Sequence, residues 1–294
     1  MDAHLVLASK QEDLFARWQL LAAGWNHEMV RHRARYEAWR AIHSGVYTRM
    51  QGPLTQRQNW IAAVLTAPIT YLDARSAAAC YGYWPWDGDY ETVVRRGNGG
   101  KRGYPGLLVA RSSTLDGQVD KKDGIPIVLA ERSLINLAPD LGTWQLGKAF
   151  REACRLQCLT ADSLARALCG QRGTALLAAL CDRYATIPYH RCRSDAECRG
   201  LEILHDAGIE PPRVNVRVRG HRPDFYWPQW RYIIEIDGPQ WHLFADEDAR
   251  KQKIWEDARN TVRRIPSGDV YDHPERLVAL ARQGERPKEG AIGP

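Results

Sequence analysis

Three carboxylates lie in an aromatic-rich stretch, RPDFYWPQWRYIIEIDGPQWH at residues 222–242, and their spacing suits metal chemistry. Side chains alternate along a β-strand, so Glu235 and Asp237 project from one face of the predicted strand while isoleucines occupy the other. Asp224 belongs to the preceding strand, and the turn between the strands brings it toward Glu235. Buried charges are costly unless they are paired, and neighbouring carboxylates oppose each other's ionisation. A hard divalent cation such as Mg²⁺ or Mn²⁺ relieves both costs, and the backbone carbonyl of Ile236 can supply a further oxygen.

A fourth acid, Glu197, lies on the apolar side of the helix predicted before these strands. Ser194 is the expected N-cap, and Glu197 shares a helix face with Leu201 and Leu204. An acid at this position indicates either a functional carboxylate or a first-turn residue that interacts favourably with the helix dipole. The residues alone leave both interpretations open.

The elements that must position these acids follow one another from residue 190 onward. The helix that begins at Ser194 is expected to end at Ala207-Gly208. The sequence then predicts strands in RVNVRVRG, DFYW and RYIIEID, a helix in FADEDARKQKIWEDAR, a strand in TVRRIP and a helix in HPERLVALARQ. The predicted order is therefore α-β-β-β-α-β-α, followed by a disordered tail over residues 285–294.

The motif Pro223-Asp224, followed by Glu235-Ile236-Asp237, resembles the PD-(D/E)XK nuclease signature. The longer string RPDF…RYIIEIDG…WH is similar to domains related to very-short-patch-repair endonucleases, and the resemblance covers about residues 194–283. It implies a restriction-endonuclease-like mixed sheet flanked by helices. It also implies that Asp224 and Glu235 bind Mg²⁺ directly and that Glu197 is an additional acidic ligand or holds a water.

The same resemblance implies roles for two residues after the strand. His242 matches a histidine that would protonate the leaving oxygen, although it can instead cap the end of the strand. Trp241 matches an aromatic residue that would insert between DNA bases, although it can instead pack in the core.

One position departs from the signature. Asp237 occupies the place of the signature's lysine, so the cation expected at this catalytic position is absent. Lys251 or Lys253, on the following helix, can replace that charge, or both can be solvated surface lysines.

The N-terminal region, residues 1–52, predicts two short helices joined by a glycine-containing turn and then a small hairpin around Ser44-Gly45. This is the outline of a winged helix-turn-helix, whose second helix would present Arg31, Arg33 and Arg35 to DNA. A basic helical hairpin without that function fits equally well. Through HSGVYTR and GIPIVLAERSLINLA, among other segments, residues 10–180 resemble the winged-helix antitoxin of abortive-infection systems, the AbiEi-like type.

The charge balance favours a nucleic-acid partner. The net charge is +6, the pI is about 9.0, and the excess is concentrated in arginine-rich segments. One of these segments contributes the further candidate DNA contacts Arg217, Arg219 and Arg222. Another, GNGGKRG at residues 97–103, lacks the GK[ST] ending of a phosphate-binding P-loop and is expected to be the tip of a basic hairpin.

Other patterns concern the compartment. No apolar run is long enough for a transmembrane helix, and the first residues lack the pattern of a signal peptide. The seven cysteines lack CxxC pairs, which favours free thiols in the cytoplasm. A zinc site would need the poorly spaced set His190, Cys192, Cys198 and His205.

The sequence thus predicts a mixed α+β or α/β chain with a winged helix-turn-helix region at 1–52, a mixed middle region at 53–190 and a nuclease-like domain at 191–284. The expected function is that of a Mg²⁺-dependent DNA endonuclease acting in repair, mobile-element biology or phage defence. A non-catalytic DNA-binding regulator or antitoxin, or an RNA-targeting toxin nuclease, remains an alternative. The presence of all three acids, Glu197, Asp224 and Glu235, favours an enzyme over a regulator. The formation of a homo-oligomer stays open.

Overall fold

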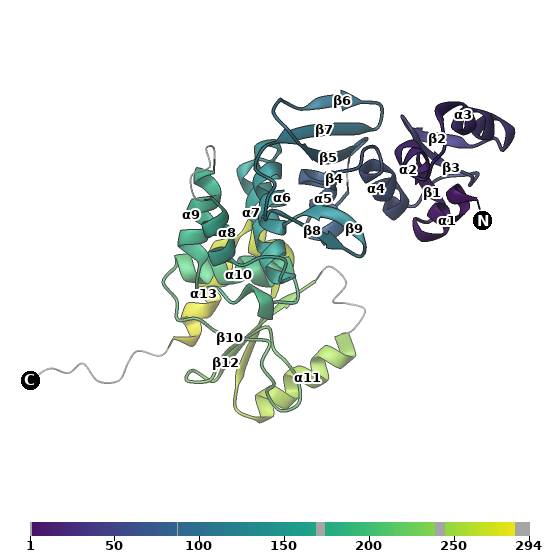
Figure 1. Cartoon of the computed structure of the whole chain (residues 1–294). Helices are drawn as coiled ribbons and strands as arrows, with labels where there is room; N and C mark the ends of the chain where they lie inside the picture. The colour runs from purple at the N-terminus through teal and green to yellow at the C-terminus, as the bar shows by residue number, and fades with distance from the viewer. Residues whose placement is uncertain (1, 87, 169–173, 239–244, 286–294) are drawn as a thin grey trace, which may run out of the picture. The chain divides into compact units, whose positions relative to one another are not determined.

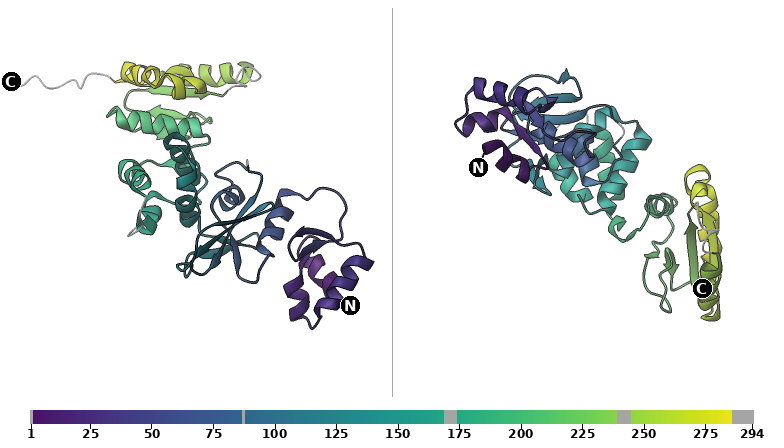
Figure 2. Two further views of the ribbon diagram at one scale, coloured as in Figure 1. Left: turned by 90° about the horizontal axis from the view of Figure 1, so that it is seen from above. Right: turned by 90° about the vertical axis from the view of Figure 1, so that its right-hand side faces the viewer.

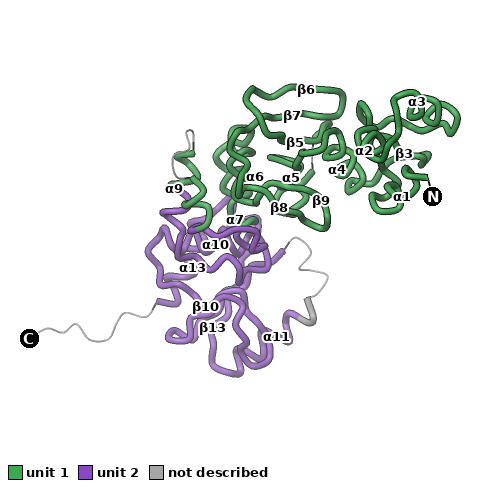
Figure 3. Tube along the Cα trace, in the orientation of Figure 1, with its two compact units in different colours: residues 1–153, 163–178 green, residues 154–162, 179–294 purple. Residues whose placement is uncertain are grey.

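The computed structural model of the 294-residue chain describes residues 2–86, 88–168, 174–238 and 245–285. Two compact units share the chain: Met1–Ala153 with Ser163–Ala178, and Cys154–Asp162 with Ala179–Pro294 (Figure 3). Each unit is therefore made of two separate segments of the chain. The sequence instead predicted a single boundary before the nuclease-like domain, at residue 190. Helices and strands are interspersed, and the four-stranded and six-stranded sheets are mixed, so the α+β class is confirmed. The predicted tail lies outside the described residues from residue 286 onward.

The first unit begins with three helices and a small antiparallel sheet of strand order β1-β3-β2. The elements are α1 (Ala3–Lys10), β1 (Leu14–Ala16), α2 (Arg17–Ala22), α3 (His27–Tyr36), β2 (Arg40–His43) and β3 (Val46–Thr48). Phe15, Leu20, Val30 and Trp39 form their buried core. The two predicted helices and the hairpin are confirmed, whereas α1 and β1 were not predicted.

A six-stranded mixed sheet, ordered β6-β7-β5-β4-β9-β8, forms the rest of this unit together with several helices (Figure 1). The strands are β4 (Thr70–Leu72), β5 (Glu91–Arg96), β6 (Arg102–Tyr104), β7 (Leu107–Ser112), β8 (Val119–Lys122) and β9 (Ile125–Val128). The helices are α4 (Gln56–Val64), α5 (Ala74–Tyr81), α6 (Ala130–Leu137) and the 3₁₀ turn η1 (Ala138–Asp140). Leu72, Val93, Val109 and Ile127 are among the buried residues that join sheet and helices into one core.

The glycine-rich loop that follows β5 is not the tip of a hairpin, so that prediction is wrong. β5 and β7 pair in parallel, and β7 takes its antiparallel partner from the three-residue strand β6. All three residues of β6 are exposed and one is a glycine, so no apolar alternation marked it as a strand.

The helices predicted between residues 143 and 187 are α7 (Thr143–Arg155), α8 (Ala161–Leu168) and α9 (Ala175–Tyr184), and a 3₁₀ turn, η2 (Tyr189–Arg191), follows them. The cysteines of the described ranges are free thiols, as expected.

The second unit contains a four-stranded sheet of order β10-β11-β12-β13, in which only β12 and β13 are parallel. Its elements are α10 (Asp195–Asp206), β10 (Arg213–Val214), β11 (Phe225–Trp227), β12 (Tyr232–Asp237), α11 (Ala245–Asp257), β13 (Thr261–Pro266), α12 (Ser267–Asp272) and α13 (Pro274–Gly284). The predicted α-β-β-β-α-β-α order is confirmed, with α12 as an addition. The strand expected in RVNVRVRG is reduced to two residues.

The two faces of this sheet contact different helices, which can be followed by colour in Figure 2. On one face α10 approaches so closely that a Cβ on Gly200 would lie 3.0 Å from the Phe225 ring and 3.3 Å from Ile236. On the other face Ile233 packs with Trp255 of α11. The close approach at Gly200 places the first turn of α10 beside the strands that carry the acids.

Candidate functional site

Asp224 and Glu235 lie opposite each other where β11 begins. The antiparallel register pairs Phe225 with Ile234, so the residue before Phe225 faces the residue after Ile234. The backbone N–H of Asp224 donates to Glu235 Oε1 over 2.9 Å, and the N–H of Ile236 donates to Asp224 Oδ2 over 2.8 Å. The backbone of each strand therefore fixes the carboxylate of the other, as the predicted turn required.

Glu197 is held at the start of α10 by a dense set of donors and is 4% exposed. Ser194 is the N-cap: its Oγ accepts from the Glu197 N–H over 3.2 Å and donates to Glu197 Oε1 over 2.9 Å. The N–H of Arg193 and the Nδ2 of Asn215 donate to Glu197 Oε2 over 3.0 and 2.6 Å. Glu197 therefore stabilises the helix start, and its charge contributes to the raised pKa of Asp224; a functional role for it stays a prediction.

Asn215 links the acids and was missed by the sequence analysis. Its backbone N–H donates to the Asp224 carbonyl over 3.1 Å, while its side-chain amide donates to Glu197. Its Oδ1 is buried and finds no hydrogen-bond donor among the described residues. The backbone has a φ of 51°, which asparagine tolerates better than most residues. The available signal was a lone asparagine inside a valine–arginine alternation.

The electrostatics of the pair disfavour two negative charges. Burial, followed by the charges of Glu235 and Glu197, raises the pKa of Asp224 well above its ordinary value. Burial also raises the pKa of Glu235 from 4.5 to about 7, partly offset by the Asp224 N–H and by Arg264. At neutral pH the pair therefore resists full ionisation unless a cation compensates it.

The oxygen atoms around the pair are ligands that suit a hard divalent cation. Asp224 and Glu235 supply carboxylate oxygens, the Ile236 carbonyl is adjacent, and the Asn215 Oδ1 is a buried acceptor without a donor. Within the ranges that the structure describes, no three His, Cys, Asp or Glu side chains already have the spacing of a metal site. The oxygens that the described residues offer a cation are those of the two carboxylates and of the neighbouring amide groups.

Asp237 shares the face of Glu235 but belongs to a separate ion-pair cluster. Arg264 of β13 donates to both Asp237 oxygens, through Nε over 3.0 Å and through Nη2, and its Nη2 also reaches Asp248 Oδ2 over 3.1 Å. The hydrogen bond to Asp237 is the largest cause of a raised pKa of Arg264. The parallel register places Arg264 directly beside Glu235. A cation therefore lies next to the position where the signature's lysine is missing.

The residue that pairs with Glu235 in the strand register is Arg264, and neither of the lysines predicted to replace the missing charge has that position. Lys251 contacts Asp248, with 3.3 Å between its Nζ and Oδ1, and Lys253 is exposed on α11. Arg264 was missed, although strand alternation in TVRRIP puts it on the face of the buried Val262.

The other residues predicted to contact DNA differ in their exposure and in their ion pairs. Arg31 and Arg35 are exposed on α3, whereas Arg33 forms ion pairs with Glu37 and Asp2. In the second unit the three predicted contacts Arg217, Arg219 and Arg222 are all exposed. Trp241 and His242 lie outside the described residues.

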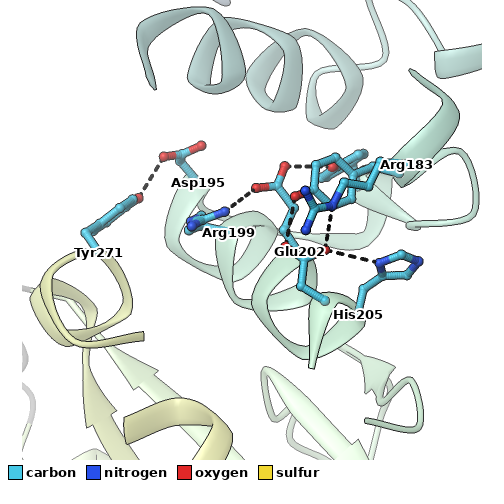
Figure 4. A network of polar contacts seen from close by, with 9 residues as sticks. Arg183, Asp195, Arg199, Glu202, His205 and Tyr271 are labelled. Carbon is cyan, nitrogen blue, oxygen red and sulfur yellow. Dashed lines mark hydrogen bonds and ion pairs between the residues drawn. The ribbon is translucent and has the colours of Figure 1, made fainter. Parts of the chain in front are cut away.

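A second polar network anchors α10 away from the acidic pair (Figure 4). The buried Glu202 accepts from Tyr189 Oη over 2.8 Å and from Arg199 Nη1 over 3.0 Å. At the helix start, Tyr271 of α12 donates to Asp195 over 2.7 Å. Glu202 and Asp195 accept from side-chain donors, whereas Asp224 and Glu235 accept from backbone N–H groups, and these side-chain contacts hold the helix in place.

The raised pKa values predict how stability depends on pH in the metal-free protein. A carboxyl with a raised folded-state pKa contributes stability that is present below its unfolded pKa and is lost as the pH rises through the folded one. The melting temperature should therefore fall between pH 4.5 and about pH 7, the limits that Glu235 sets. Calorimetry of the wild type and Glu235→Gln should show a weaker decline in the variant. Identical profiles would mean that Glu235 does not titrate in this range.

Comparison with known proteins adds no assignment: no family model and no curated protein sequence matches the chain. In the described part of the chain no helix is long and apolar enough to cross a membrane.

Proposed function

We propose that the chain is a Mg²⁺-dependent DNA endonuclease whose second unit hydrolyses phosphodiester bonds. The observation that carries the proposal is the half-buried Asp224–Glu235 pair, in which each carboxylate accepts a backbone N–H from the other strand and has a raised pKa. Carboxylates held together at such a cost in electrostatic energy are typical of functional sites.

The strand arrangement supports the nuclease resemblance. Asp224 precedes one strand, Glu235 and Asp237 lie on its antiparallel neighbour, and Glu197 starts the helix packed on the same sheet. This is the arrangement that the PD-(D/E)XK resemblance implies for Mg²⁺ ligands. A bound Mg²⁺ would lower the pKa of a water and neutralise charge on the scissile phosphate.

The chain's own residues would orient and stabilise the reacting groups. Asp224 and Glu235 would hold the cation, and the hydrogen bonds from the backbone keep both carboxylates fixed before substrate arrives. Glu197 and Asn215 extend this acidic end of the sheet and would orient a water.

Arg264 is proposed to supply the positive charge that the signature's lysine would give. It lies beside Glu235 in the register and is held by Asp237 and Asp248, so its guanidinium has little freedom. A fixed guanidinium next to the acids would stabilise negative charge on the phosphate. Asp237 would then be a positioning residue for Arg264.

The first 52 residues are proposed to bind DNA as a winged helix. Their order α1-β1-α2-α3-β2-β3 and sheet order β1-β3-β2 match that architecture, with α3 in the place of the recognition helix. Among the residues that the structure describes, Arg31 forms an ion pair with Glu28 of its own helix alone, and both side chains are 75% exposed. Such a pair is weak, so Arg31 can exchange its partner for a phosphate.

Removal of two charges from α3 should weaken DNA binding. In Arg31→Gln/Arg35→Gln, affinity for duplex DNA should fall roughly tenfold and the slope of log affinity against log salt should decrease by about two. Fluorescence anisotropy at several salt concentrations measures both quantities. Arg282→Gln, an exposed charge change on α13, is the control. An equal loss in the control would show that α3 has no special role.

A non-catalytic DNA-binding regulator or antitoxin remains the second candidate. The observation that favours it is the ion pair of Asp237, which occupies the signature's lysine position and ties up the neighbouring Arg264. An RNA-targeting nuclease would use the same acids on another substrate.

Cleavage assays separate these candidates. Purified protein incubated with supercoiled plasmid should give nicked or linear DNA in Mg²⁺ or Mn²⁺ and none in EDTA. Metal-dependent degradation of RNA alone would support the RNA nuclease. DNA binding without metal-dependent products on either substrate would support the regulator.

A further inference from the structure

A basic pocket of about 340 Å³ lies in the first unit, remote in sequence from the acids of the nuclease-like sheet. Its lining residues come from β5, the end of β7, the start of α5, the loop before β6, and α6 with the 3₁₀ turn that follows it. Its volume is within the range of small-molecule sites. Neither the proposed nuclease nor the proposed DNA-binding helix uses it.

Three cations face this pocket: Lys101, Arg111 and Arg132. Arg132 donates to the side chains of Ser112, Thr114 and Asn136, which fix its orientation without neutralising it. None of the carboxylates in the described ranges forms an ion pair with Arg111 or Arg132. Lys101 has Asp140 at 4.0 Å, at the outer limit of an ion pair between exposed side chains.

The glycine-rich loop is built against one of these cations. Gly97 and Gly99 have φ angles of +140° and +131°, which L side chains rarely adopt. A Cβ on Gly97 would lie 3.4 Å from Arg111 Nη1, and one on Gly99 would lie 3.7 Å from Arg111 Cγ. The backbone of the loop therefore needs glycine at both positions, and both glycines lie within contact distance of the Arg111 side chain.

The one acid that lines the pocket is largely offset. Asp73 is buried, and its Oδ1 accepts from the Ala74 N–H over 2.8 Å and from Asn136 Nδ2 over 2.7 Å. Burial raises the pKa of Asp73, while these hydrogen bonds and the charges of Arg132 and Lys101 lower it in part, and even an ionised Asp73 is one negative charge against three cations. The pocket therefore keeps a net positive character.

The remaining wall is apolar and is formed by Val94, Ala110, Ile135 and Pro139. A cationic end next to an apolar wall suits a ligand that carries a phosphate on a flat organic group. We propose that this pocket binds a nucleoside monophosphate, with the phosphate between Lys101, Arg111 and Arg132 and the base along the apolar wall.

Calorimetric titration of the full chain with AMP tests this proposal, and inorganic phosphate serves as competitor. AMP should bind the wild type with a Kd below about 1 mM. Arg111→Gln and Lys101→Gln should each weaken binding about tenfold, because each removes a charge-assisted hydrogen bond. Arg102→Gln is the matched control, because this neighbour of Lys101 is exposed over the Tyr104 ring and does not line the pocket.

The contrary outcomes are distinct. Absence of AMP binding up to about 10 mM, or equal weakening in Arg102→Gln, overturns the proposal. Charge-sensitive binding of a single-stranded oligonucleotide without AMP binding would identify a backbone phosphate and also overturn it. Broadening of the AMP phosphorus resonance by the wild-type protein gives a readout that needs no variant. None of these results depends on whether the second unit cleaves DNA.

Discussion

Asp224→Asn and Glu235→Gln are expected to abolish cleavage and at the same time to stabilise the fold. Each variant removes a proposed ligand of the cation and with it several kcal/mol of transition-state stabilisation. The cleavage rate should therefore fall about a thousandfold. Each also removes one of two half-buried, mutually repelling carboxylates with raised pKa values, while the amide can still accept the backbone hydrogen bond. At about pH 8 the free energy of unfolding should therefore rise by about 1–3 kcal/mol.

Plasmid nicking rates and thermal melting curves, measured on the same preparations, check both halves of this prediction. Glu210→Gln is the control, since its side chain is exposed and away from the pair. Loss of cleavage together with a lower melting temperature would show that the carboxylates support folding. Unchanged cleavage in both variants would remove them from the chemistry.

Arg264→Gln is expected to have the second largest effect, on both stability and rate. The substitution leaves Asp237 and Asp248, which are 12% and 24% exposed, without their shared cation. Loss of one partner from such a partly buried cluster should lower the free energy of unfolding by about 2–4 kcal/mol. Cleavage should fall by about a hundredfold or more, because the guanidinium beside Glu235 is lost.

The double variant Arg264→Gln/Asp237→Asn separates the two effects. It should recover much of the stability, because the unpaired Asp237 charge is gone, while cleavage stays low. Chemical denaturation and nicking assays on both variants provide the readouts. Recovery of cleavage together with stability would mean that Arg264 has only a structural role.

The alternation of apolar and acidic residues was enough to predict how the acidic pair forms. Period-two patterning placed Glu235 on one face of its strand, and the short turn after Trp227 required Asp224 to return beside it. Glu197 was recognisable because an acid on an apolar helix face is unusual.

Other features depended on contacts that local pattern does not encode. Arg264 reaches Asp237 through a parallel pairing with a strand that lies beyond a whole helix, so its register had no local signal. Asn215 lies just after a two-residue strand, and its role follows from one left-handed backbone position. The sequence predicted that β5 and β7 form a hairpin, but β6 intervenes and the two strands pair in parallel. All three residues of β6 are exposed, so no local pattern of apolar residues marked it as a strand.

Binding of a divalent cation to the acidic pair tests the central claim most directly. Mn²⁺ titrated into the wild type at about pH 6, in buffers of different ionisation enthalpy, should bind and release about one proton, because Glu235 is then largely protonated and must ionise to bind metal. Glu235→Gln should bind more weakly and release fewer protons. If the two proteins give the same heat and the same proton release, or if the wild type binds no cation, Asp224 and Glu235 do not form a metal centre.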